Sequence, residues 1–377
     1  MSGIYIHIPF CKQACYYCDF HFSTSLKKKS EMIACLVKEI ELRKSELKGA
    51  IIETIYFGGG TPSVLEVDEI QLIINAVYQN FDVVEHPEIT LEANPDDLSE
   101  AKIIALSKSP INRLSIGIQS FFEKDLKLMN RAHNAQEAKE CLSVAIRHFD
   151  NISIDLIYGI PDCSNQEWKE NIETALRFGV PHISSYALTV EPKTALASFI
   201  EKGIIATIDD EKAQEQFHIL IEELERADFI HYETSNFGKE GFFSKNNSSY
   251  WLGKKYLGIG PSAHSFDGEV RSWNVRNNAK YIKAIQQSQL EIERETLSKK
   301  DQYNEYVMTG LRTIWGVSLT KIASDFGEKY LKYLENQSKK YINEELLYIE
   351  NEILKTTKKG KFLSDGIAAD LFMLNLI

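Results

Sequence analysis

Three of the six cysteines fall within eight positions of one another, at Cys11, Cys15 and Cys18. Cysteine thiolates are the usual protein ligands of iron–sulfur clusters, so this spacing can hold three corners of a cubane [4Fe–4S] cluster. A fourth cysteine would complete an electron-transfer site, but the other three lie far along the chain: Cys35, Cys141 and Cys163. One iron would therefore stay open to a small ligand, as a catalytic metal site requires.

Two other interpretations of these cysteines stay open at this point. Zinc could bind the three thiolates with His7 or His21 as its fourth ligand, although structural zinc sites usually use paired cysteine knuckles and only one is present here. The cysteines could also be ordinary core residues. Six cysteines in 377 residues do not indicate a disulfide framework.

A second set of residues that could do chemistry follows the other predicted strands. The set comprises the run Gly58, Gly59, Gly60 and Thr61, then Glu92, Gln119 and Asp155. Glycine adds no Cβ, so a glycine run lets backbone N–H groups approach a ligand closely. Because the loops after parallel strands converge at one edge of a sheet, we expect all of these residues to lie near the cysteines.

The elements that must position these residues alternate along the first half of the chain. Short apolar runs typical of strands cover residues 4–8, 54–57, 88–92, 113–118, 152–157 and 183–188. Amphipathic helical patterns lie between them, for example at residues 30–47, 67–79, 135–148 and 166–178. This alternation predicts an α/β fold with a parallel sheet, and six units indicate a partial (β/α)6 barrel rather than a closed eight-stranded one.

The pattern changes after residue 200, which divides the chain into three predicted parts. Residues 1–200 form the partial barrel with the cysteines and the strand-end residues. Residues 201–290 extend the barrel with a helix at 209–227 and a loop-rich, aromatic stretch that we expect to face the substrate. Residues 291–377 are helical, end in a strand pattern near 352–362, and resemble a small winged-helix domain. Their nearly balanced charge predicts a packing or lid role rather than DNA binding.

Composition limits the partners that this chain can have. The net charge of -11 disfavours nucleic acid, since holding a phosphate backbone needs clustered Lys and Arg. No run approaches the roughly 20 apolar residues that cross a bilayer, and the N-terminal segment has no basic-then-apolar signal pattern. We therefore expect a cytoplasmic protein.

The pattern C-x3-C-x-aromatic-C, with Tyr17 as the aromatic residue, resembles the signature of the radical SAM superfamily. That resemblance implies that the open iron chelates the methionine group of S-adenosylmethionine (SAM), and that Tyr17 lies near the adenine. The glycine run would approach the methionine moiety, and Glu92 would accept from the ribose or the amine. Gln119 would offer a second polar edge, Arg131 a carboxylate partner and Asp155 a partner for a hydroxyl pair.

The resemblance can be narrowed by motifs that run from Tyr5 to about Phe266. YIHIPFC, YFGGGTPS, LEANP, SIGIQSF, NRAH, IDLIYGIP and LGIGPSAHS together are similar to the oxygen-independent coproporphyrinogen III oxidase family. By that resemblance the SAM-contacting positions are Tyr5, Gly59, Gly60, Thr61, Glu92, Gln119, Arg131, Asp155 and Ala187.

Two branches of this family differ near the cysteines. The decarboxylases have an N-terminal extension and a further cysteine two places after the cluster motif. This chain begins ten residues before Cys11 and has Phe20 at that place, so it is more similar to the HemW branch of heme chaperones. The resemblance implies heme or another tetrapyrrole as ligand and apo-heme proteins as recipients. Oxidative decarboxylation of coproporphyrinogen III is the alternative function, and a homodimer is kept open.

One departure from the HemW pattern concerns the heme ligand. The branch has His-Asn-x-x-Tyr-Trp, whereas this chain has Asn246 and Asn247 before Tyr250 and Trp251. An amide is a poor ligand for heme iron compared with imidazole. Either another histidine takes over the role or heme affinity is reduced, and the nearest histidines in sequence are His231 and His264. The two aromatic residues could stack on a porphyrin face.

Overall fold

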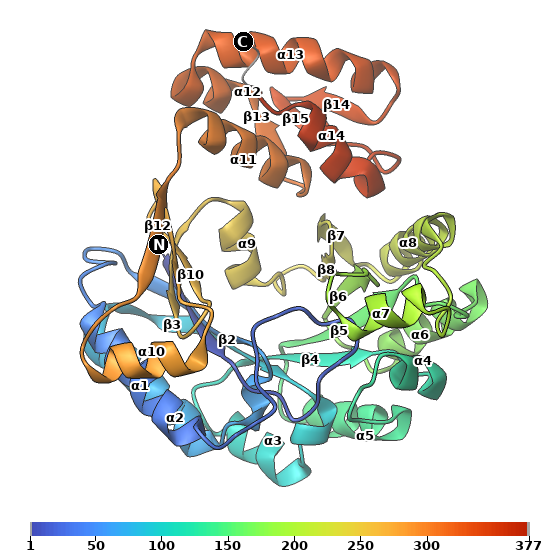
Figure 1. Ribbon diagram of the computed structural model, residues 1–377. Coiled ribbons are helices and arrows are strands. Elements are labelled where there is room, and N and C mark those ends of the chain that lie inside the picture. The colour runs from blue at the N-terminus through green and yellow to red at the C-terminus, as the bar shows by residue number, and fades with distance from the viewer. Residues whose placement is uncertain (1, 375–377) are drawn as a thin grey trace.

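The six expected strands form the centre of one twelve-stranded sheet in the computed structural model, which describes residues 2–374 (Figure 1). They are β1 (Ser2–Ile8), β2 (Ile52–Gly59), β3 (Val83–Ala93), β4 (Arg113–Gln119), β5 (Ile152–Tyr158) and β6 (His182–Ala187). Each pairs with the next in parallel, in chain order. This arrangement confirms the partial (β/α)6 barrel predicted from the alternation of strands and helices.

The two faces of this sheet differ in polarity. In β1, Ile4, Ile6 and Ile8 are buried in the main apolar core, whereas the intervening Tyr5 is half-buried. A Cβ built on Gly58 of β2 would lie 2.8 Å from the Tyr5 ring, so these positions share the other face. Successive side chains of a strand point to opposite faces. The inner, concave face is therefore the polar one, which suits it to hold a ligand.

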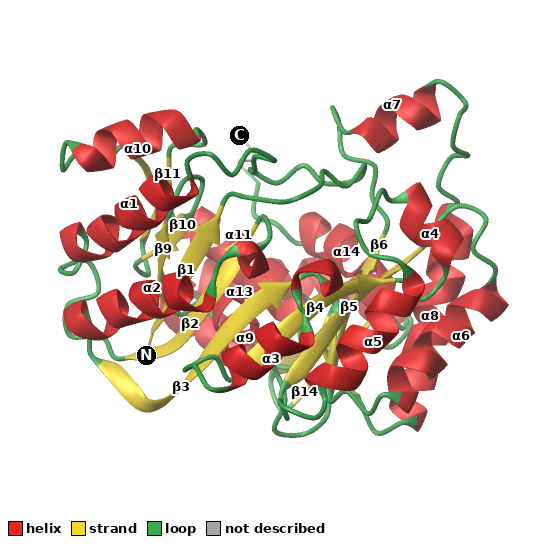
Figure 2. Ribbon diagram, turned by 90° about the horizontal axis from the view of Figure 1, so that it is seen from below, coloured by secondary structure: helices red, strands yellow, loops and turns green. Residues whose placement is uncertain are grey.

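Helices cover the outer face of the sheet and give the apolar strand positions their partners (Figure 2). These helices are α1 (Lys29–Leu42), α2 (Val67–Asn80), α3 (Glu100–Ser107), α4 (Glu123–Leu128), α5 (Ala135–Ala145), α6 (Asn165–Arg177) and α8 (Asp210–Arg226). α7 (Ala195–Glu201) lies instead beside the loop after β1, where the Leu196 N–H donates to the Tyr16 carbonyl at 2.8 Å. Ser164 caps α6 and Asn134 caps α5, each with a reciprocal capping box that begins the helix where the sequence pattern predicted it.

Short strands extend the sheet at both edges, in a stretch that the sequence indicated as loop-rich. They are β7 (Ile230–Glu233), β8 (Asn236–Gly238), β9 (Lys255–Ile259), β10 (His264–Phe266), β11 (Val270–Asn274) and β12 (Ile292–Thr296). β9 pairs in parallel with β1, and β10 to β12 continue antiparallel from it. Strands of three to five residues carry too little alternation to be recognised, so the sequence did not predict these short strands, of which β12 lies beyond the loop-rich stretch.

A short helix, α9 (Lys245–Trp251), lies over the inner face and contacts β1 and β2 (Figure 1). The backbone N–H groups of Lys245 and Asn246 both donate to the Glu88 carboxylate of β3, at 3.0 Å. A carboxylate at a helix start satisfies donors that have no intrahelical partner. This contact fixes α9 against the sheet, while α10 (Asn278–Gln286) packs outside against α1.

The C-terminal residues form a second, smaller apolar core. Its elements are α11 (Lys299–Leu311), β13 (Val317–Ser318), α12 (Leu319–Lys321), α13 (Glu328–Asn343), β14 (Leu347–Glu350), β15 (Ile353–Thr356) and α14 (Ser364–Asp370). The strands form a three-stranded antiparallel sheet beside the helices, as expected of a winged-helix-like domain. The strand expected near 352–362 ends at Thr356, and a 3-10 turn occupies Lys361–Leu363.

The C-terminal domain contacts the inner side of the barrel through backbone and side chains. The Ile314 N–H donates to the Tyr232 carbonyl at 3.0 Å, and Arg271 pairs with Glu305 at 2.9 Å. In Figure 1 it lies above α9, on the side of the sheet away from α2 and α3. Across residues 2–374, no helix is both long and apolar enough to cross a membrane.

Candidate functional site

The loop after β1 carries the three clustered cysteines and is tied down at several points. The Cys11 N–H donates to the Ser23 carbonyl at 3.1 Å, and the Tyr16 N–H donates to the Met129 carbonyl at 3.1 Å. Cys11 is buried, whereas Cys15 and Cys18 are half-buried, and all three are free thiols. Burial raises the pKa of Cys11 to about 12, and the other two cysteines add to the rise, which places all three within electrostatic reach of one another.

The geometry of the loop does not support the zinc alternative. Ligands of one tetrahedral zinc ion converge to about 3.8 Å of each other, given zinc–sulfur bonds of about 2.3 Å. Among residues 2–374, no group of three His, Cys, Asp or Glu side chains is placed to hold a single metal ion. The ring of His7 bonds the His21 carbonyl at 2.9 Å, and His21 bonds Asn278 at 2.7 Å. A cubane cluster instead takes each thiolate on a different iron, which needs no such convergence.

Two side chains from other parts of the chain reach the cysteine sulfurs. The Thr61 hydroxyl donates to Cys11 Sγ at 3.2 Å, and Arg131 Nη1 lies 3.4 Å from Cys15 Sγ. Donors aimed at sulfur stabilise its thiolate form, which is the form that ligates iron. The loop therefore fits a cluster held by thiolates.

The glycine run lies against this loop with almost no free space. Gly59 has φ +107°, a conformation that side chains rarely adopt, and a Cβ there would come within 2.6 Å of the His7 ring. A Cβ on Gly60 would come within 2.6 Å of the Phe10 carbonyl. The Thr61 N–H donates to that same carbonyl at 2.7 Å. Only glycine fits these two positions, because both backbones must approach closely.

Glu92 lies at the carboxyl end of β3, between two tyrosines of neighbouring strands. The Tyr56 hydroxyl donates to Glu92 Oε1 at 2.8 Å, and the Tyr56 ring stacks on Tyr5 with centroids 6.0 Å apart. Burial raises the pKa of Glu92 to about 7, and the negative charge of Asp155 adds to this rise. The carboxylate is therefore partly protonated near neutral pH and gains from a cationic partner such as an ammonium group.

Asp155 of β5 shares the inner face with a fully buried arginine. Burial raises the pKa of Asp155 to about 6, while Arg113 and a hydrogen bond from Ser115 at 3.4 Å oppose the rise. Arg113 is 1% exposed, and its positive charge also acts on Glu92. The floor of the site thus carries one positive and two negative side chains, held apart on three strands.

Arg131 connects the cysteine loop to β3 and β4. Its Nη2 donates to Asn94 Oδ1 at 2.7 Å and to the Gly117 carbonyl at 2.9 Å, and its Nη1 lies 3.4 Å from the Tyr17 hydroxyl. Gln119 ends β4 with φ +67°, and this backbone turn brings its side-chain amide near Gly117. Arg131 follows α4 and not a strand, so the resemblance, and not its place at a strand end, indicated it.

The strand-end residues were expected to lie together at the carboxyl edge of the parallel sheet, and they do lie there in the structure. Ala187 ends β6, where it pairs with Tyr158 of β5. Three side chains were missed: Tyr56, Asn94 and Arg113. Tyr56 lies two residues before Gly58 on the same face, so the alternation of β2 was a signal that could have found it. Arg113 begins its strand rather than ending it, and strand-end reasoning gives no signal there.

The residues expected near heme do not all lie in one place. Tyr250 and His264 line an open pocket beside the cysteine loop, and the other four lie away from it. Asn246 is 4% exposed inside the barrel, where its Oδ1 accepts from Thr54 at 3.1 Å. His231 is also buried, stacked on Phe237 with centroids 4.1 Å apart, and its ring nitrogens face Thr234 and Lys361. Trp251 lies under the Arg312 guanidinium of the C-terminal domain, and the Asn247 N–H donates to the hydroxyl of Ser244, which caps α9. None of these four lines the pocket described next.

An open pocket of about 540 Å³ lies beside the cysteine loop, between α9 and the strands of the β9–β11 edge. Its lining comprises Tyr5, His7, Asp19, Phe20, His21, Tyr250, Tyr256, Ser262, His264 and Arg276. The pocket thus shares Tyr5 with the Glu92 region, and Asp19, Phe20 and His21 with the cysteine loop. Its volume lies within the range of about 300–1,000 Å³ that is typical of ligand pockets.

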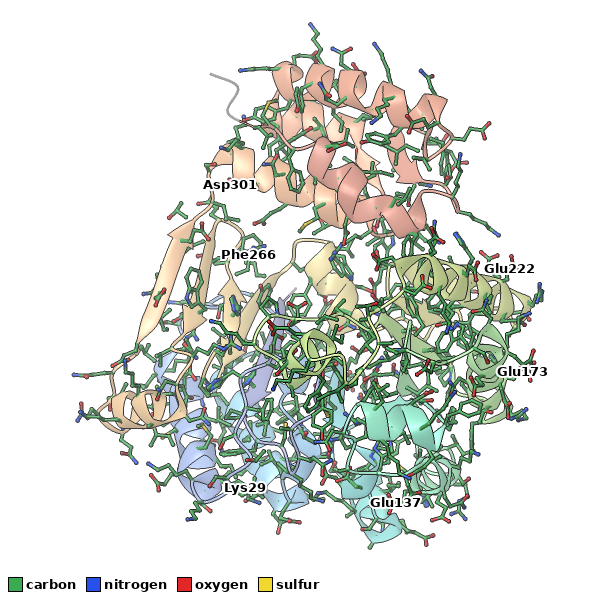
Figure 3. All side chains as sticks on the ribbon, turned by 45° about the vertical axis from the view of Figure 1, so that its right-hand side comes forward. Lys29, Glu137, Glu173, Glu222, Phe266 and Asp301 are labelled. Carbon is green, nitrogen blue, oxygen red and sulfur yellow. The ribbon has the colours of Figure 1, made fainter. Side chains whose placement is uncertain are left out.

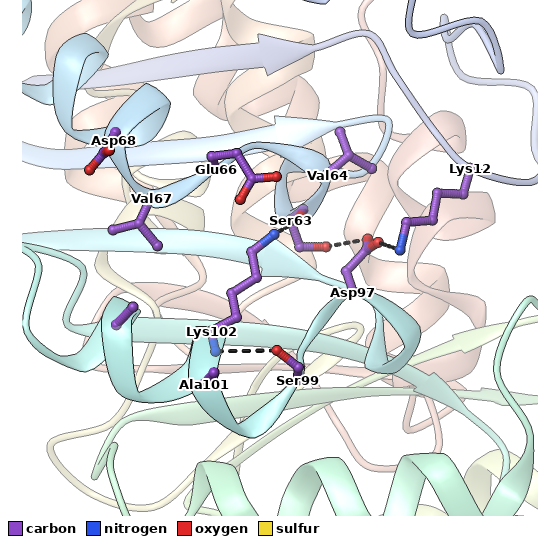
Figure 4. Close-up of a pocket in the computed structure, with 11 residues that line it drawn as sticks. Lys12, Ser63, Val64, Glu66, Val67, Asp68, Asp97, Ser99, Ala101 and Lys102 are labelled. Carbon is purple, nitrogen blue, oxygen red and sulfur yellow. Dashed lines mark hydrogen bonds and ion pairs between the residues drawn. The ribbon is translucent and has the colours of Figure 1, made fainter.

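A second hollow, of about 660 Å³, lies on the outer side of the barrel between α2 and α3 (Figure 4). Lys12 of the cysteine loop pairs there with Asp97, which accepts a hydrogen bond from Ser63 at 2.7 Å. Lys102 donates to the Ser63 carbonyl at 2.5 Å. Each charged group in these contacts has a partner. The contacts therefore attach the cysteine loop to the segments that follow β2 and β3.

Comparisons with known proteins agree with this geometry. Residues 5–175 match the family model of the Radical SAM superfamily, and residues 297–363 match that of the HemN C-terminal domain. The structure resembles the coproporphyrinogen III oxidase HemN of Escherichia coli, with TM-score 0.85 over 99% of this chain and 90% of that one, at 20% identity. At that identity the likeness shows the fold.

Full-length relatives narrow the assignment. The heme chaperone HemW of Lactococcus lactis is 33% identical over 97% of this chain and 96% of its own. That of Bacillus subtilis is 31% identical over 97% and 98%. The fold and the cysteine loop thus define a radical SAM protein, a class whose cofactors are a [4Fe–4S] cluster and SAM. Within that class, the chain belongs to the HemW family.

Proposed function

We propose that this chain binds heme and delivers it to apo-proteins, with a [4Fe–4S] cluster on Cys11, Cys15 and Cys18. The pocket beside the cysteine loop carries this proposal, because its lining combines aromatic rings, histidines and an arginine. Heme is a flat apolar ring with an iron and two carboxylates, so it needs a lining of this kind. Relatives that match the chain over nearly its full length are named heme chaperones.

Ten residues of the inner face, the strand ends and the cysteine loop are proposed to hold SAM on the open iron of the cluster. They are Tyr5, Tyr17, Gly59, Gly60, Thr61, Glu92, Gln119, Arg131, Asp155 and Ala187. When bound, the cluster and SAM supply a 5′-deoxyadenosyl radical, the shared chemistry of the superfamily. Glu92 would bind the methionine amine, because a buried carboxylate with a raised pKa gains from a cation. Arg131 would hold Cys15 and Tyr17 in place through its two bonds to the sheet.

The proposal includes the setting in which the chain works. We place it in the cytoplasm, with apo-heme proteins as recipients and without nucleic acid. Residues 1–200 would hold the cluster and SAM, residues 201–290 the heme pocket, and residues 291–377 a domain that packs over the inner face. The homodimer is kept as an option for its assembly.

Decarboxylation of coproporphyrinogen III is the second candidate function. It is favoured by one feature of the site: the pocket opens directly onto the cysteine loop, so a tetrapyrrole there lies close to the proposed radical source. Phe20 opposes it, because this side chain is 68% exposed at the rim, in place of the further cysteine of the decarboxylases.

A hemin titration of the anaerobically reconstituted protein tests the proposal. Soret absorbance should show saturable binding near one heme per chain. The same preparation should leave coproporphyrinogen III unchanged under reducing conditions with SAM, as followed by chromatography of the porphyrins. Absence of saturable binding would reject heme delivery, and release of carbon dioxide from coproporphyrinogen would establish the second candidate.

A further inference from the structure

Resting on the proposed heme binding, we infer that His264 is the iron ligand for heme in this chain. The heme would then occupy the pocket between the cysteine loop and the β9–β10 turn, and the residue at position 246 would take no part in ligation. Asn246 lies one helical turn before Tyr250 on the same face of α9, buried beneath it, and does not itself line this pocket, whereas His264 does.

Asn246 is unable to reach a ligand in the pocket. It is 4% exposed, its N–H is bonded to Glu88, and its side-chain oxygen is bonded to Thr54. Both partners belong to the sheet under α9. Turning this side chain outward would break its buried hydrogen bond with Thr54, and a buried group left unsatisfied costs about 1–3 kcal/mol. An amide is also a weak ligand for heme iron.

The His264 ring meets the requirements of an iron ligand. The residue is exposed and lines the pocket, with Tyr250 and Tyr256 in the same lining. Burial of the ring and the positive charge of Arg271 lower the pKa of His264, and no hydrogen bond contributes to this shift. The imidazole is therefore neutral at pH 7, which is the form that binds a metal.

Each of the other two histidines of the pocket has one ring nitrogen, Nε2, in a hydrogen bond. His7 is 5% exposed, and its Nε2 lies 2.9 Å from the His21 carbonyl. His21 Nε2 lies 2.7 Å from Asn278 Oδ1. His231 faces Lys361 instead of this pocket. Among the three histidines of this lining, His264 is the exposed one, and its ring makes no hydrogen bond with the residues that the structure describes.

The backbone under His264 is held rigidly, as a ligand position requires. A Cβ on Gly258 would come within 2.1 Å of the His264 carbonyl oxygen, so β9 and β10 are in direct contact. Ser265 accepts from the Gly258 N–H at 2.9 Å and from Arg43 at 3.1 Å. Arg43 also donates to the Gly258 carbonyl at 2.8 Å. A histidine on such a rigid backbone loses little further conformational entropy when it binds a ligand.

The rest of the lining fits the remaining parts of heme. Tyr250 and Tyr256 lie edge to face, with centroids 4.6 Å apart, and offer aromatic surface for the porphyrin ring. Arg276 is exposed at the rim and is held by the Asp19 carbonyl. A guanidinium pairs well with a carboxylate, so Arg276 suits a propionate. The pocket thus provides an iron ligand, a ring surface and a cation.

The test compares hemin binding by the anaerobically reconstituted full-length chain in four forms. These are the wild type, His264→Ala, His264→Gln and the control His148→Ala, whose exposed side chain is outside this pocket. Loss of a second-sphere partner weakens metal binding roughly 10–100-fold, so loss of the ligand itself should weaken hemin binding at least as much. Both His264 variants should lose the histidine-type Soret band, and added imidazole should restore it in His264→Ala. His148→Ala should match the wild type.

Iron and sulfide content, together with near-UV circular dichroism, shows that each variant keeps its cluster and fold. If the wild type binds hemin while both His264 variants keep its Soret band and affinity, the ligand assignment is overturned and heme binding stands. If the wild type shows no saturable binding, the proposed function itself fails, and the assignment with it. Rescue by imidazole supports the assignment, because a purely structural defect would not respond to a free ligand.

Discussion

Replacing Arg43 with methionine should destabilise the barrel strongly, because this arginine is the cation of a buried ion pair. Arg43 and Glu39 of α1 are 1% and 0% exposed, with Arg43 Nη1 3.0 Å from Glu39 Oε1. Removing one partner of a buried pair typically costs about 3–5 kcal/mol, since the other charge is left uncompensated. Glu39 keeps neutral donors from Tyr281 at 2.6 Å and Asn274 at 2.7 Å, so we expect about 3 kcal/mol.

Thermal unfolding of the reconstituted protein measures this effect. A chain of 377 residues has an unfolding entropy of about 0.8 kcal/mol/K, so a loss of 3 kcal/mol lowers Tm by about 4 °C. Arg177→Met is the matched control. Arg177 lies on a helix with its partner Glu173, labelled in Figure 3, at 4.0 Å, and their side chains are 65% and 57% exposed. Such exposed pairs contribute about 0–1 kcal/mol, so this Tm should change by no more than about 1 °C.

The reasoning is refuted if Arg43→Met and Arg177→Met unfold at the same temperature. Equal Tm values would mean that the Glu39 network does not hold the β9–β10 turn. Arg43→Met should also disturb the proposed heme site, because Arg43 donates hydrogen bonds to Gly258 and Ser265 next to His264. We therefore expect weaker hemin binding from Arg43→Met even below its unfolding transition, with unchanged binding by Arg177→Met.

Two further predictions concern SAM. The pKa of Glu92, about 7, predicts that SAM affinity rises between about pH 6 and pH 8 as this carboxylate ionises. Calorimetry on Glu92→Gln should show weaker binding without that slope, and an unchanged slope would remove Glu92 from the site. Gly59→Ala should reduce SAM binding sharply, because its Cβ would come within 2.6 Å of His7. Gly49→Ala is the matched control, with φ +79° but nothing within 4 Å, and equal binding by both variants would contradict the close approach.

The partial barrel could be predicted because each of its strands carries its own local signal. β1 to β6 are buried, apolar on one face and separated by amphipathic helices, so periodicity alone located them. The rule that loops converge at the carboxyl edge then placed Glu92, Gln119 and Asp155 in one site. These inferences needed no knowledge of contacts between distant segments.

The heme region could not be predicted in this way, because distant partners determine it. Asn246 is buried through Thr54 and Glu88, which precede it by 192 and 158 positions. β9 pairs with β1 across most of the chain, and that pairing brings His264 to the cysteine loop. His231 and His264 are both near position 246 in the sequence, so the sequence favoured neither of them as the heme ligand. The order of the strands in the sheet decides that the His231 ring is buried and that the His264 ring lines the pocket.

Electron paramagnetic resonance of the reduced protein, with and without SAM, tests the central claim most directly. Wild type and the control Cys35→Ala should contain about four irons per chain and give a [4Fe–4S] signal that changes shape when SAM binds the open iron. Cys35 is a buried cysteine of α1 outside the loop, so it controls for loss of a thiol. Cys15→Ala should lack both the iron and the signal. A full iron content in Cys15→Ala, or a wild-type signal indifferent to SAM, would contradict the assignment of this site.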